Sequence, residues 1–268
     1  MPTLTEQVVA IARDAGDAIM EIYATDFQTY TKSDSSPLTD ADLAAHRIIC
    51  EGLARVSSYP ILSEESASEE VTWEKRKHWQ AYWLVDPLDG TKEFVKKTGE
   101  FTVNIALITQ GKASLGVVYC PPLKRVYFAT QGQGAFRQDD GCQKVRLNGA
   151  TTPKDDEPWK VIGSKSHGTD ALTRFCSQLG SVTMVSMGSS LKLCLVAEGQ
   201  AHIYPRLAPT CEWDTAAAQA VVEEAGGIVL SPDLSPLLYG QKESLLNSEF
   251  VVYSGEFTSF EWLSDLFW

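Results

Sequence analysis

Two carboxylates in the segment WLVDPLDGTKEF (83–94) have the spacing of metal ligands. An apolar run ends at Asp86, and Asp89 follows three residues later. Pro87 fixes its own φ and has no backbone N–H, so the strand is expected to stop and the chain to turn there. Asp86 and Asp89 can then reach one point from two directions, with the carbonyl of Leu88 directed inward. This pattern predicts oxygen ligands for a hard cation.

Two further carboxylates stand at the ends of predicted elements. Glu64 directly follows the apolar segment PILS (60–63), and Asp214 lies at the head of a predicted helix in CEWDTAAAQAVVEEAGG. Taken singly, such residues are most often turn or cap residues. Four carboxylates at one sheet edge would raise one another's pKa values, and divalent cations, above all Mg²⁺, remove that conflict. Asp86 is placed to bridge two ions, as in-line phosphoryl displacement requires.

The residues after Asp89 are suited to bind an anion. Gly90 permits a close backbone approach, and the amides of Gly90 and Thr91 stand at the start of a predicted helix, whose positive end favours phosphate. The motif therefore combines metal ligands with a candidate phosphate site.

The composition restricts the class of ligand. The chain has 268 residues, 44 % of them hydrophobic, and a formal net charge of −12. This charge argues against a nucleic acid polymer, since little counterion release would repay binding. A small phosphorylated ligand remains compatible if metal ions reverse the charge locally. The six cysteines contain no CxxC pair, so zinc is not predicted and free thiols are expected.

No targeting or membrane signal is visible in the sequence. No stretch approaches the roughly 18 consecutive apolar residues of a transmembrane helix. The N-terminal MPTLTEQVVAIARD lacks the basic and apolar regions of a signal peptide. We therefore expect a cytoplasmic protein without a transmembrane segment.

The C-terminal segment FTSFEWLSDLFW (257–268) is rich in aromatic residues. Phe260, Leu263 and Phe267 share one helical face, which predicts docking on the body of the protein. A dimer contact, or weak peripheral attachment to the cytoplasmic face of a membrane, is the alternative.

Apolar periodicity predicts alternating helices and strands. Helices are expected at the N-terminus, where Thr3 and Glu6 can form a capping box, and from Asp40 to Val56 after Thr39. The expected strands of the first half are 60–63, 82–85, 101–109, 113–120 and 125–130, the last three as an antiparallel meander, with a loop over 64–80. Later elements are expected at KVIGS, VTMVS, AHIY, GIVLS and FVVYS as strands and near 169–179, 190–198 and 214–225 as helices.

The polar segment 150–158 divides the chain into two predicted lobes of one compact unit. Residues 1–150 would form a metal-binding catalytic lobe of helices and antiparallel sheet. Residues 151–268 would form an α/β lobe that selects the substrate. This order of elements predicts a layered α/β architecture.

Three motifs, in this order, resemble the signature of the Mg²⁺-dependent, lithium-sensitive phosphatase superfamily that includes the inositol monophosphatases. They are SEES (63–66), DPLDGTKEF (86–94) and WDTAAAQAVVEEAGG (213–227). Longer stretches, such as GSSLKLCLVAEGQAHIYPR (188–206), resemble bacterial 3'(2'),5'-bisphosphate nucleotidases of the CysQ type. The resemblance implies an α/β (α+β layered) fold, a sugar-phosphatase-like αβαβα sandwich with two lobes. It also implies two or three Mg²⁺ ions and inhibition by Li⁺.

The same resemblance implies roles for individual residues. The implied metal ligands are Glu64, Asp86, the carbonyl of Leu88, Asp89 and Asp214. Asp42 and Thr91, with Glu64, are implied as catalytic residues that hold and deprotonate the attacking water. Asp42 also fits a capping box with Thr39 in the sequence TDAD, so both interpretations stay open.

The second lobe is expected to select the phosphate ester. Lys192 and Arg206 suit a ligand with a second phosphate, because lysine offers a point charge and arginine a forked donor. The resemblance implies a nucleotide pocket lined by Gly90, Thr91, Ser166, His167, Ser189, Lys192 and Arg206. The implied reaction is hydrolysis of adenosine 3',5'-bisphosphate to AMP and phosphate, with the sulfated nucleotide PAPS as a further candidate substrate.

Three alternatives remain. An inositol monophosphate or polyphosphate phosphatase of the same superfamily is the nearest. A haloacid-dehalogenase-like phosphotransferase would use an Asp nucleophile in a DxDGT string, but here Pro87 and Leu88 separate the aspartates by one residue too many. The third is a non-enzymatic acidic module that binds divalent ions or a protein.

Overall fold

The computed structural model describes residues 2–31, 37–66, 71–154, 156–163, 170–255 and 263. Two long helices open it, α1 (Leu4–Tyr23) and α2 (Asp40–Val56). Both begin with a reciprocal capping box, Thr3 with Glu6 and Thr39 with Asp42, so these predicted starts are confirmed. A short antiparallel ribbon joins them, β1 (Thr29–Thr31) with β2 (Pro37–Thr39).

A seven-stranded sheet follows, with strand order β3-β4-β5-β6-β7-β8-β9. Its strands are β3 (Ile61–Ser63), β4 (Ala81–Asp89), β5 (Thr102–Thr109), β6 (Lys112–Cys120), β7 (Arg125–Thr130), β8 (Gly134–Asp139) and β9 (Val145–Arg146). Only the β3–β4 pair is parallel among these described strands, and β5, β6 and β7 form the predicted antiparallel meander.

A second, five-stranded sheet has the order β11-β10-β12-β14-β13. Its strands are β10 (Trp159–Gly163), β11 (Val182–Ser186), β12 (Ile203–Arg206), β13 (Ile228–Leu230) and β14 (Phe250–Tyr253). The helices of this half are α5 (Asp170–Gln178), α6 (Leu191–Ala197) and α7 (Ala216–Glu224). All lie close to their expected positions.

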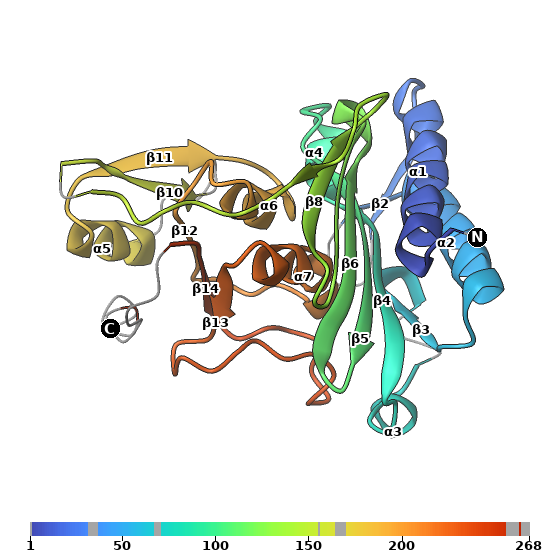
Figure 1. Ribbon diagram of the computed structural model, residues 1–268. Helices are drawn as coiled ribbons and strands as arrows, with labels where there is room; N and C mark the ends of the chain where they lie inside the picture. Colours follow the sequence, from blue (N-terminus) through green and yellow to red (C-terminus); the bar gives the residue numbers. More distant parts are fainter. Residues whose placement is uncertain are drawn as a thin grey trace.

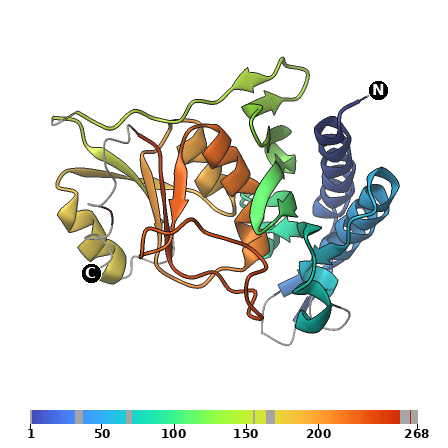
Figure 2. The same cartoon turned by 60° about the horizontal axis from the view of Figure 1, so that its bottom comes forward.

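Helices and sheets alternate in five layers (Figure 1). The helices α1 and α2 cover one face of the seven-stranded sheet, α6 and α7 lie between the two sheets, and α5 covers the outer face of the second sheet. Figure 2 shows the same separation after rotation, with α1 and α2 side by side at one end. The predicted αβαβα sandwich is therefore confirmed.

The central layer packs closely against the first sheet. A Cβ built on Gly116 of β6 would stand 2.1 Å from the carbonyl oxygen of Ala217 in α7, so only glycine permits this approach of helix to strand. The core between the sheets draws on both halves of the chain, for example Leu84 and Val118 with Val196 and Val221. This packing fixes the helix that follows Asp214.

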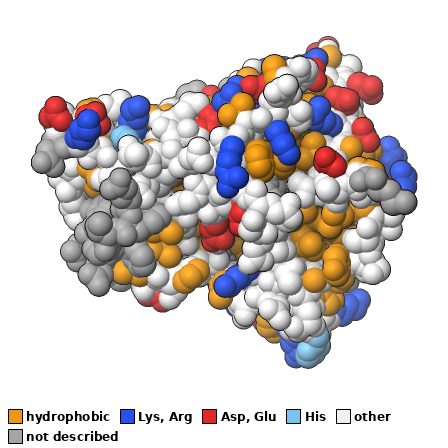
Figure 3. Space-filling view, in the orientation of Figure 1, with side chains coloured by type: hydrophobic (Ala, Val, Ile, Leu, Met, Phe, Trp, Pro, Cys, Tyr) orange, Lys and Arg blue, Asp and Glu red, His pale blue; other side chains and the backbone are white. Residues whose placement is uncertain are grey.

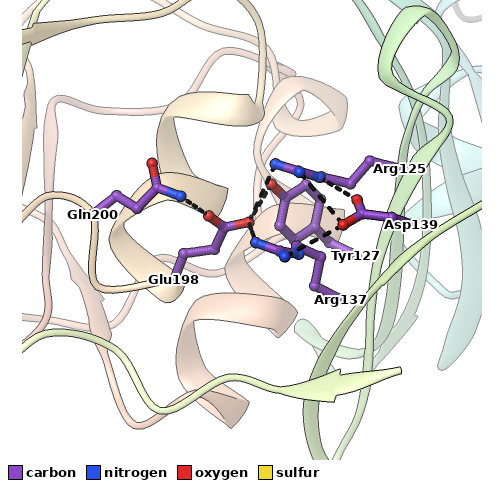
Figure 4. Close-up of polar contacts among 6 residues, drawn as sticks. All are labelled: Arg125, Tyr127, Arg137, Asp139, Glu198 and Gln200. Carbon is purple, nitrogen blue, oxygen red and sulfur yellow. Dashed lines mark hydrogen bonds and ion pairs between the residues drawn. The ribbon is translucent and has the colours of Figure 1, made fainter. Parts of the chain in front are cut away.

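A network of charged and polar side chains also links α6 to the first sheet (Figure 4). Glu198, at the C-terminal cap of α6, is almost fully buried and accepts a hydrogen bond of 2.5 Å from the hydroxyl of Tyr127 on β7. Arg137 on β8 lies 3.3 Å from the same carboxylate, and Arg125 on β7 lies 3.8 Å from it. Asp139 holds both arginines from the other side, 2.5 Å from Arg125 and 3.3 Å from Arg137.

Three sequence predictions need correction. The expected loop over 64–80 contains a short helix, α3 (Trp73–Arg76), where Arg76 is buried and donates to the backbone carbonyls of Lys242 and Glu243. The strands β8 and β9 were not predicted. The strand β4 does not stop at Asp86 but continues to Asp89, with an irregular register across Pro87 and Leu88.

Candidate active site

Parallel pairing of β3 with β4 brings the first two carboxylates together. Ser63 pairs with Val85, so Glu64 leaves β3 beside Asp86 on β4. Burial is the largest cause of a raised Asp86 pKa, and the neighbouring Glu64 raises it further by its charge and by a hydrogen bond. Asp86 is only 1 % exposed. These two residues therefore belong to one cluster.

The irregular end of β4 brings Asp89 to the same place. Asp86 is paired with Asn104 of β5, and Asp89 with Thr102, so the four residues 86–89 of β4 lie opposite the three residues 102–104 of β5. The amide of Leu88 donates to Asp86 Oδ1 at 3.0 Å, which closes the distorted segment on itself. Pro87 can occupy this position because a bulge does not need its missing N–H.

Asp214 approaches from the second half of the chain. It ends a short 3₁₀ turn (Glu212–Asp214) just before α7, and its Oδ2 accepts the amide of Cys211 at 2.9 Å. Single carboxylate oxygens of Asp86, Asp89 and Asp214 all lie within 4.8 Å of one another. Segments that are more than 100 residues apart in the sequence thus form one acidic cluster.

The cluster is electrostatically unfavourable without a counter-charge. Burial raises the pKa of Asp89 to about 6 and that of Asp214 to about 8, from an ordinary value of 3.8. Repulsion by the neighbouring carboxylates adds to this effect at Asp214. Lys192 and Arg206 act in the opposite direction, on Asp89 and Asp214 respectively, but do not overcome it.

These donors fit a hard divalent cation. All of them are oxygens, three converge within reach of one ion, and their negative charges are close enough to oppose ionisation unless a cation is bound. Among the described residues, no thiol or imidazole belongs to the converging set. A soft or nitrogen-preferring metal would have no favoured ligand here.

Asp42 and Thr91 meet at the edge of this cluster. Asp42 Oδ2 accepts from both the amide (2.7 Å) and the hydroxyl (2.6 Å) of Thr39, which is the capping role. Its Oδ1 lies 3.2 Å from the Thr91 hydroxyl, which is also 3.2 Å from the carbonyl oxygen of Leu88. The same buried carboxylate therefore caps α2 and contacts Thr91, so the two interpretations of Asp42 are compatible.

Three residues that hold Asp89 were not predicted from the sequence. The amide of Ser190 donates to Asp89 Oδ2 at 2.6 Å, and Asn104 donates to the same oxygen at 3.4 Å. The Ser190 hydroxyl lies 2.8 Å from both Asn104 Oδ1 and Thr102 Oγ1. The available signal was the pair of polar residues, Thr102 and Asn104, in the apolar strand FTVNIALI, but their partner Ser190 lies 88 and 86 residues away in the sequence.

A cavity of about 470 Å³ opens beside the carboxylates. Its wall includes Asp89 and Asp214 together with four predicted pocket residues, Gly90, Ser189, Lys192 and Arg206. Tyr204, Leu193 and Phe250 supply apolar surface. The size lies within the usual range for a small-molecule site. Ser166 and His167, also predicted here, lie outside the described residues.

The molecular surface carries both signs of charge. Figure 3 shows lysine and arginine side chains interspersed with acidic ones on this face, without a continuous basic band. The face seen in Figure 3 thus lacks the electrostatic footprint of a nucleic acid polymer site. Among the described residues, no helix is both long and apolar enough to cross a membrane.

Comparison with known proteins agrees with this geometry. The family model described as "Inositol monophosphatase family" matches residues 1–258. The chain belongs to the inositol monophosphatase family. Metal dependence is a property of this family, and the acidic cluster supplies suitable ligands in this member.

Relatives within the inositol monophosphatase family are similar along nearly their whole length. The chain is 50 % identical to the 3'(2'),5'-bisphosphate nucleotidase CysQ of Salmonella typhimurium over 252 residues, which cover 93 % of this chain and 99 % of the relative. It is 48 % identical to CysQ of Escherichia coli strain K12 with the same coverage. The crystal structure of CysQ from Bacteroides thetaiotaomicron matches with a TM-score of 0.79 at 38 % identity, covering 93 % of this chain and 96 % of that one.

Proposed function

We propose that this chain hydrolyses adenosine 3',5'-bisphosphate to AMP and phosphate in a Mg²⁺-dependent reaction. The observation that carries the proposal is the meeting of two unlike groups in one cavity. Asp89 and Asp214 supply ligands for cations, and Lys192 and Arg206 supply positive charge for a second phosphate. The names and full-length similarity of the bisphosphate nucleotidase relatives support the same substrate.

The proposed cation ligands are Asp86, Asp89 and Asp214, with Glu64 and the carbonyl oxygen of Leu88 completing the set. When bound, two or three Mg²⁺ ions would lower the pKa of a water and stabilise the negative charge on the leaving oxygen. Ionisation of the buried carboxylates is unfavourable in the cation-free protein, so cation and ligands stabilise each other. Inhibition by Li⁺ is part of the proposal.

Asp42 and Thr91 are the proposed route for the proton of the attacking water. The Thr91 hydroxyl can accept that proton while passing its own to Asp42 Oδ1, 3.2 Å away. The other oxygen of Asp42 is held by Thr39, so the accepting oxygen keeps a fixed direction. Attack by water on the 3'-phosphorus breaks its bond to the 3'-oxygen, which leaves with a proton, and no covalent enzyme intermediate is needed.

Lys192 and Arg206, with Ser189, are the proposed contacts to the nucleotide from the second lobe, residues 151–268. Residues 1–150 are the proposed catalytic lobe. Basic groups in the cavity wall favour a bisphosphate over inositol monophosphate, whose hydroxyls carry no negative charge to pair with them. The sulfated nucleotide PAPS fits the same description and is a secondary candidate.

A substrate panel tests the proposal. Phosphate release is measured with Mg²⁺, with and without Li⁺, from adenosine 3',5'-bisphosphate, PAPS, inositol monophosphate and fructose bisphosphate. We expect adenosine 3',5'-bisphosphate to give the highest kcat/KM, chelator to abolish the activity, and Li⁺ to inhibit it. Preference for inositol monophosphate would assign the chain to the alternative activity. Trapping of a phosphoaspartate at Asp86 would indicate the dehalogenase-like mechanism, and absence of chelator-sensitive phosphate release would indicate a binding module.

A further inference from the structure

Among the described residues, three cationic side chains line the cavity, and two of them already have partners. Lys192 donates to the carbonyl oxygen of Ser189 at 3.1 Å and lies over the ring of Tyr204, 5.9 Å from its centre. Arg206 donates through Nε to Ala208 and through Nη2 to Pro209, at 3.0 and 2.8 Å. Both cations also act on the acidic cluster. Part of their charge is therefore engaged before a substrate arrives.

The third cation, Lys92, is not engaged in this way by any residue that the structure describes. It follows Thr91 as the second residue of α4 (Thr91–Val95), it is exposed, and it lines the cavity. Within the part of the chain that the structure describes, its ammonium forms no hydrogen bond, ion pair or ring contact. The adjacent Glu93 also lines the cavity, but successive residues of a helix do not face each other, so it does not neutralise Lys92.

We propose that Lys92 binds the second phosphate of the bisphosphate substrate and is a specificity-determining residue. This inference rests on the proposed function. Its neighbour Thr91 contacts Asp42 beside the acidic cluster, so the reacting phosphate and Lys92 share one edge of the cavity. A lysine ammonium suits this role, because its three rotatable donors can follow the orientation of a phosphate at the end of a flexible substrate.

Because no described residue pairs with its ammonium, Lys92 is an effective contact for a phosphate. Binding a phosphate to Lys92 breaks no hydrogen bond to a described residue. The favourable free energy of this contact is therefore reduced only by desolvation and by the ordering of one side chain. In contrast, a phosphate reaching Lys192 or Arg206 competes with backbone carbonyls. Selection of bisphosphates would then depend on both halves of the chain and not on the second lobe alone.

The test compares two substrates that differ by the second phosphate, adenosine 3',5'-bisphosphate and 3'-AMP. The measured quantity is the ratio of the kcat/KM for the bisphosphate to that for 3'-AMP. It is determined for the wild type, Lys92→Gln, Lys92→Arg and the control Lys96→Gln. Lys96 is an exposed lysine at the end of the same helix, outside the cavity wall. We expect Lys92→Gln to lower the ratio at least tenfold, chiefly through KM for the bisphosphate. Lys92→Arg should recover most of it, and Lys96→Gln should change it less than twofold.

The outcomes separate this inference from the proposed function. A wild-type enzyme that prefers the bisphosphate, with a ratio within twofold of wild type in Lys92→Gln, would overturn the role of Lys92 alone. A wild-type enzyme without any preference for the bisphosphate would overturn the proposed function and this inference with it. A lowered ratio at an unchanged thermal unfolding midpoint would support the inference, because a merely structural defect would affect both substrates alike.

Discussion

The hydrogen bond from Tyr127 to Glu198 should contribute measurably to stability. Tyr127 is 1 % exposed, and burial raises the pKa of its hydroxyl, which therefore stays protonated and donates to the Glu198 carboxylate at 2.5 Å (Figure 4). Tyr127→Phe removes this one donor and leaves the ring in place. Glu198 keeps Arg137 at 3.3 Å and Arg125 at 3.8 Å, so its charge is not left without a partner.

The expected loss follows from the type of bond. Hydrogen bonds to charged groups contribute about 1.5–3 kcal/mol, and the remaining arginines limit the penalty for the carboxylate, so we expect about 2 kcal/mol. For a chain of this size, that loss lowers the thermal unfolding midpoint by roughly 4–8 °C. Urea unfolding followed by circular dichroism measures the free energy directly.

Two further variants make the measurement specific. Tyr59→Phe is the matched control, since Tyr59 is 44 % exposed, and it should change the free energy of unfolding by less than about 0.5 kcal/mol. In a double-mutant cycle with Glu198→Gln, we expect a coupling energy of about 1 kcal/mol or more, because both changes act on one bond. A Tyr127→Phe variant as stable as Tyr59→Phe would refute the claim that this network anchors α6 to the first sheet.

Two predictions concern the acidic cluster. Asp89→Asn should reduce phosphate release below a few per cent of wild type, because asparagine lacks the charge that a cation requires. The circular dichroism spectrum should stay native, because asparagine retains an oxygen that accepts the Ser190 amide. Substantial residual activity would contradict the proposed ligand set. The second prediction follows from pKa values that are raised in the folded state, to about 6 for Asp89 and about 8 for Asp214. Protons are then bound more tightly by the folded protein than by the unfolded chain, in which these aspartates titrate near 3.8, so the stability that they contribute to the cation-free protein should fall as the pH rises from about 4 to about 8. Mg²⁺ should raise the unfolding midpoint more at pH 8 than at pH 6, and Asp214→Asn should weaken both trends; a pH-independent effect of Mg²⁺ would count against coupling of these carboxylates to the cation.

Local signals accounted for much of what the sequence could predict. The two capping boxes at Thr3 and Thr39 fix helix starts through contacts between residues three apart, which a sequence displays directly. The apolar strands of the meander are equally plain, because a central strand buried on both faces reads as a continuous apolar run. Such features need no knowledge of the tertiary structure.

Features that depend on distant partners were missed. The strand β8 (GAFRQD) is polar at its C-terminal end, so it does not show the apolar pattern of a buried strand. Its Arg137 and Asp139 are accommodated there because they form ion pairs with Glu198 and Arg125, respectively. Ser190 holds Asp89 across 101 residues, so nothing near either residue indicates the bond. The helix α3 is anchored by contacts of Arg76 with carbonyls 166 and 167 residues away. In each case the tertiary contact decides the structure, and local propensity is a weak guide.

Asp42 shows why the sequence left two interpretations open. The segment TDAD is sufficient for a capping box, and the structure confirms that one oxygen of Asp42 serves the cap. The contact of the other oxygen with Thr91 arises only because β4 continues through its irregular segment and delivers Thr91 to the start of α2. A carboxylate has two oxygens, so one residue can do both, and the sequence offers no reason to choose.

Gathering the carboxylates of the acidic cluster costs free energy, and contacts from the rest of the fold hold these side chains in position. The carboxylates repel one another and are desolvated, so the surrounding contacts must fix their positions. Those contacts come from both halves of the chain: Ser190 holds Asp89 at the start of α6, and Glu198 fastens the end of the same helix to β7 and β8. Backbone amides hold the carboxylates individually: Ser190 donates to Asp89, Cys211 to Asp214 and Leu88 to Asp86. The energy of that repulsion is then available to favour cation binding, which explains why a site of this charge can be built inside an acidic protein.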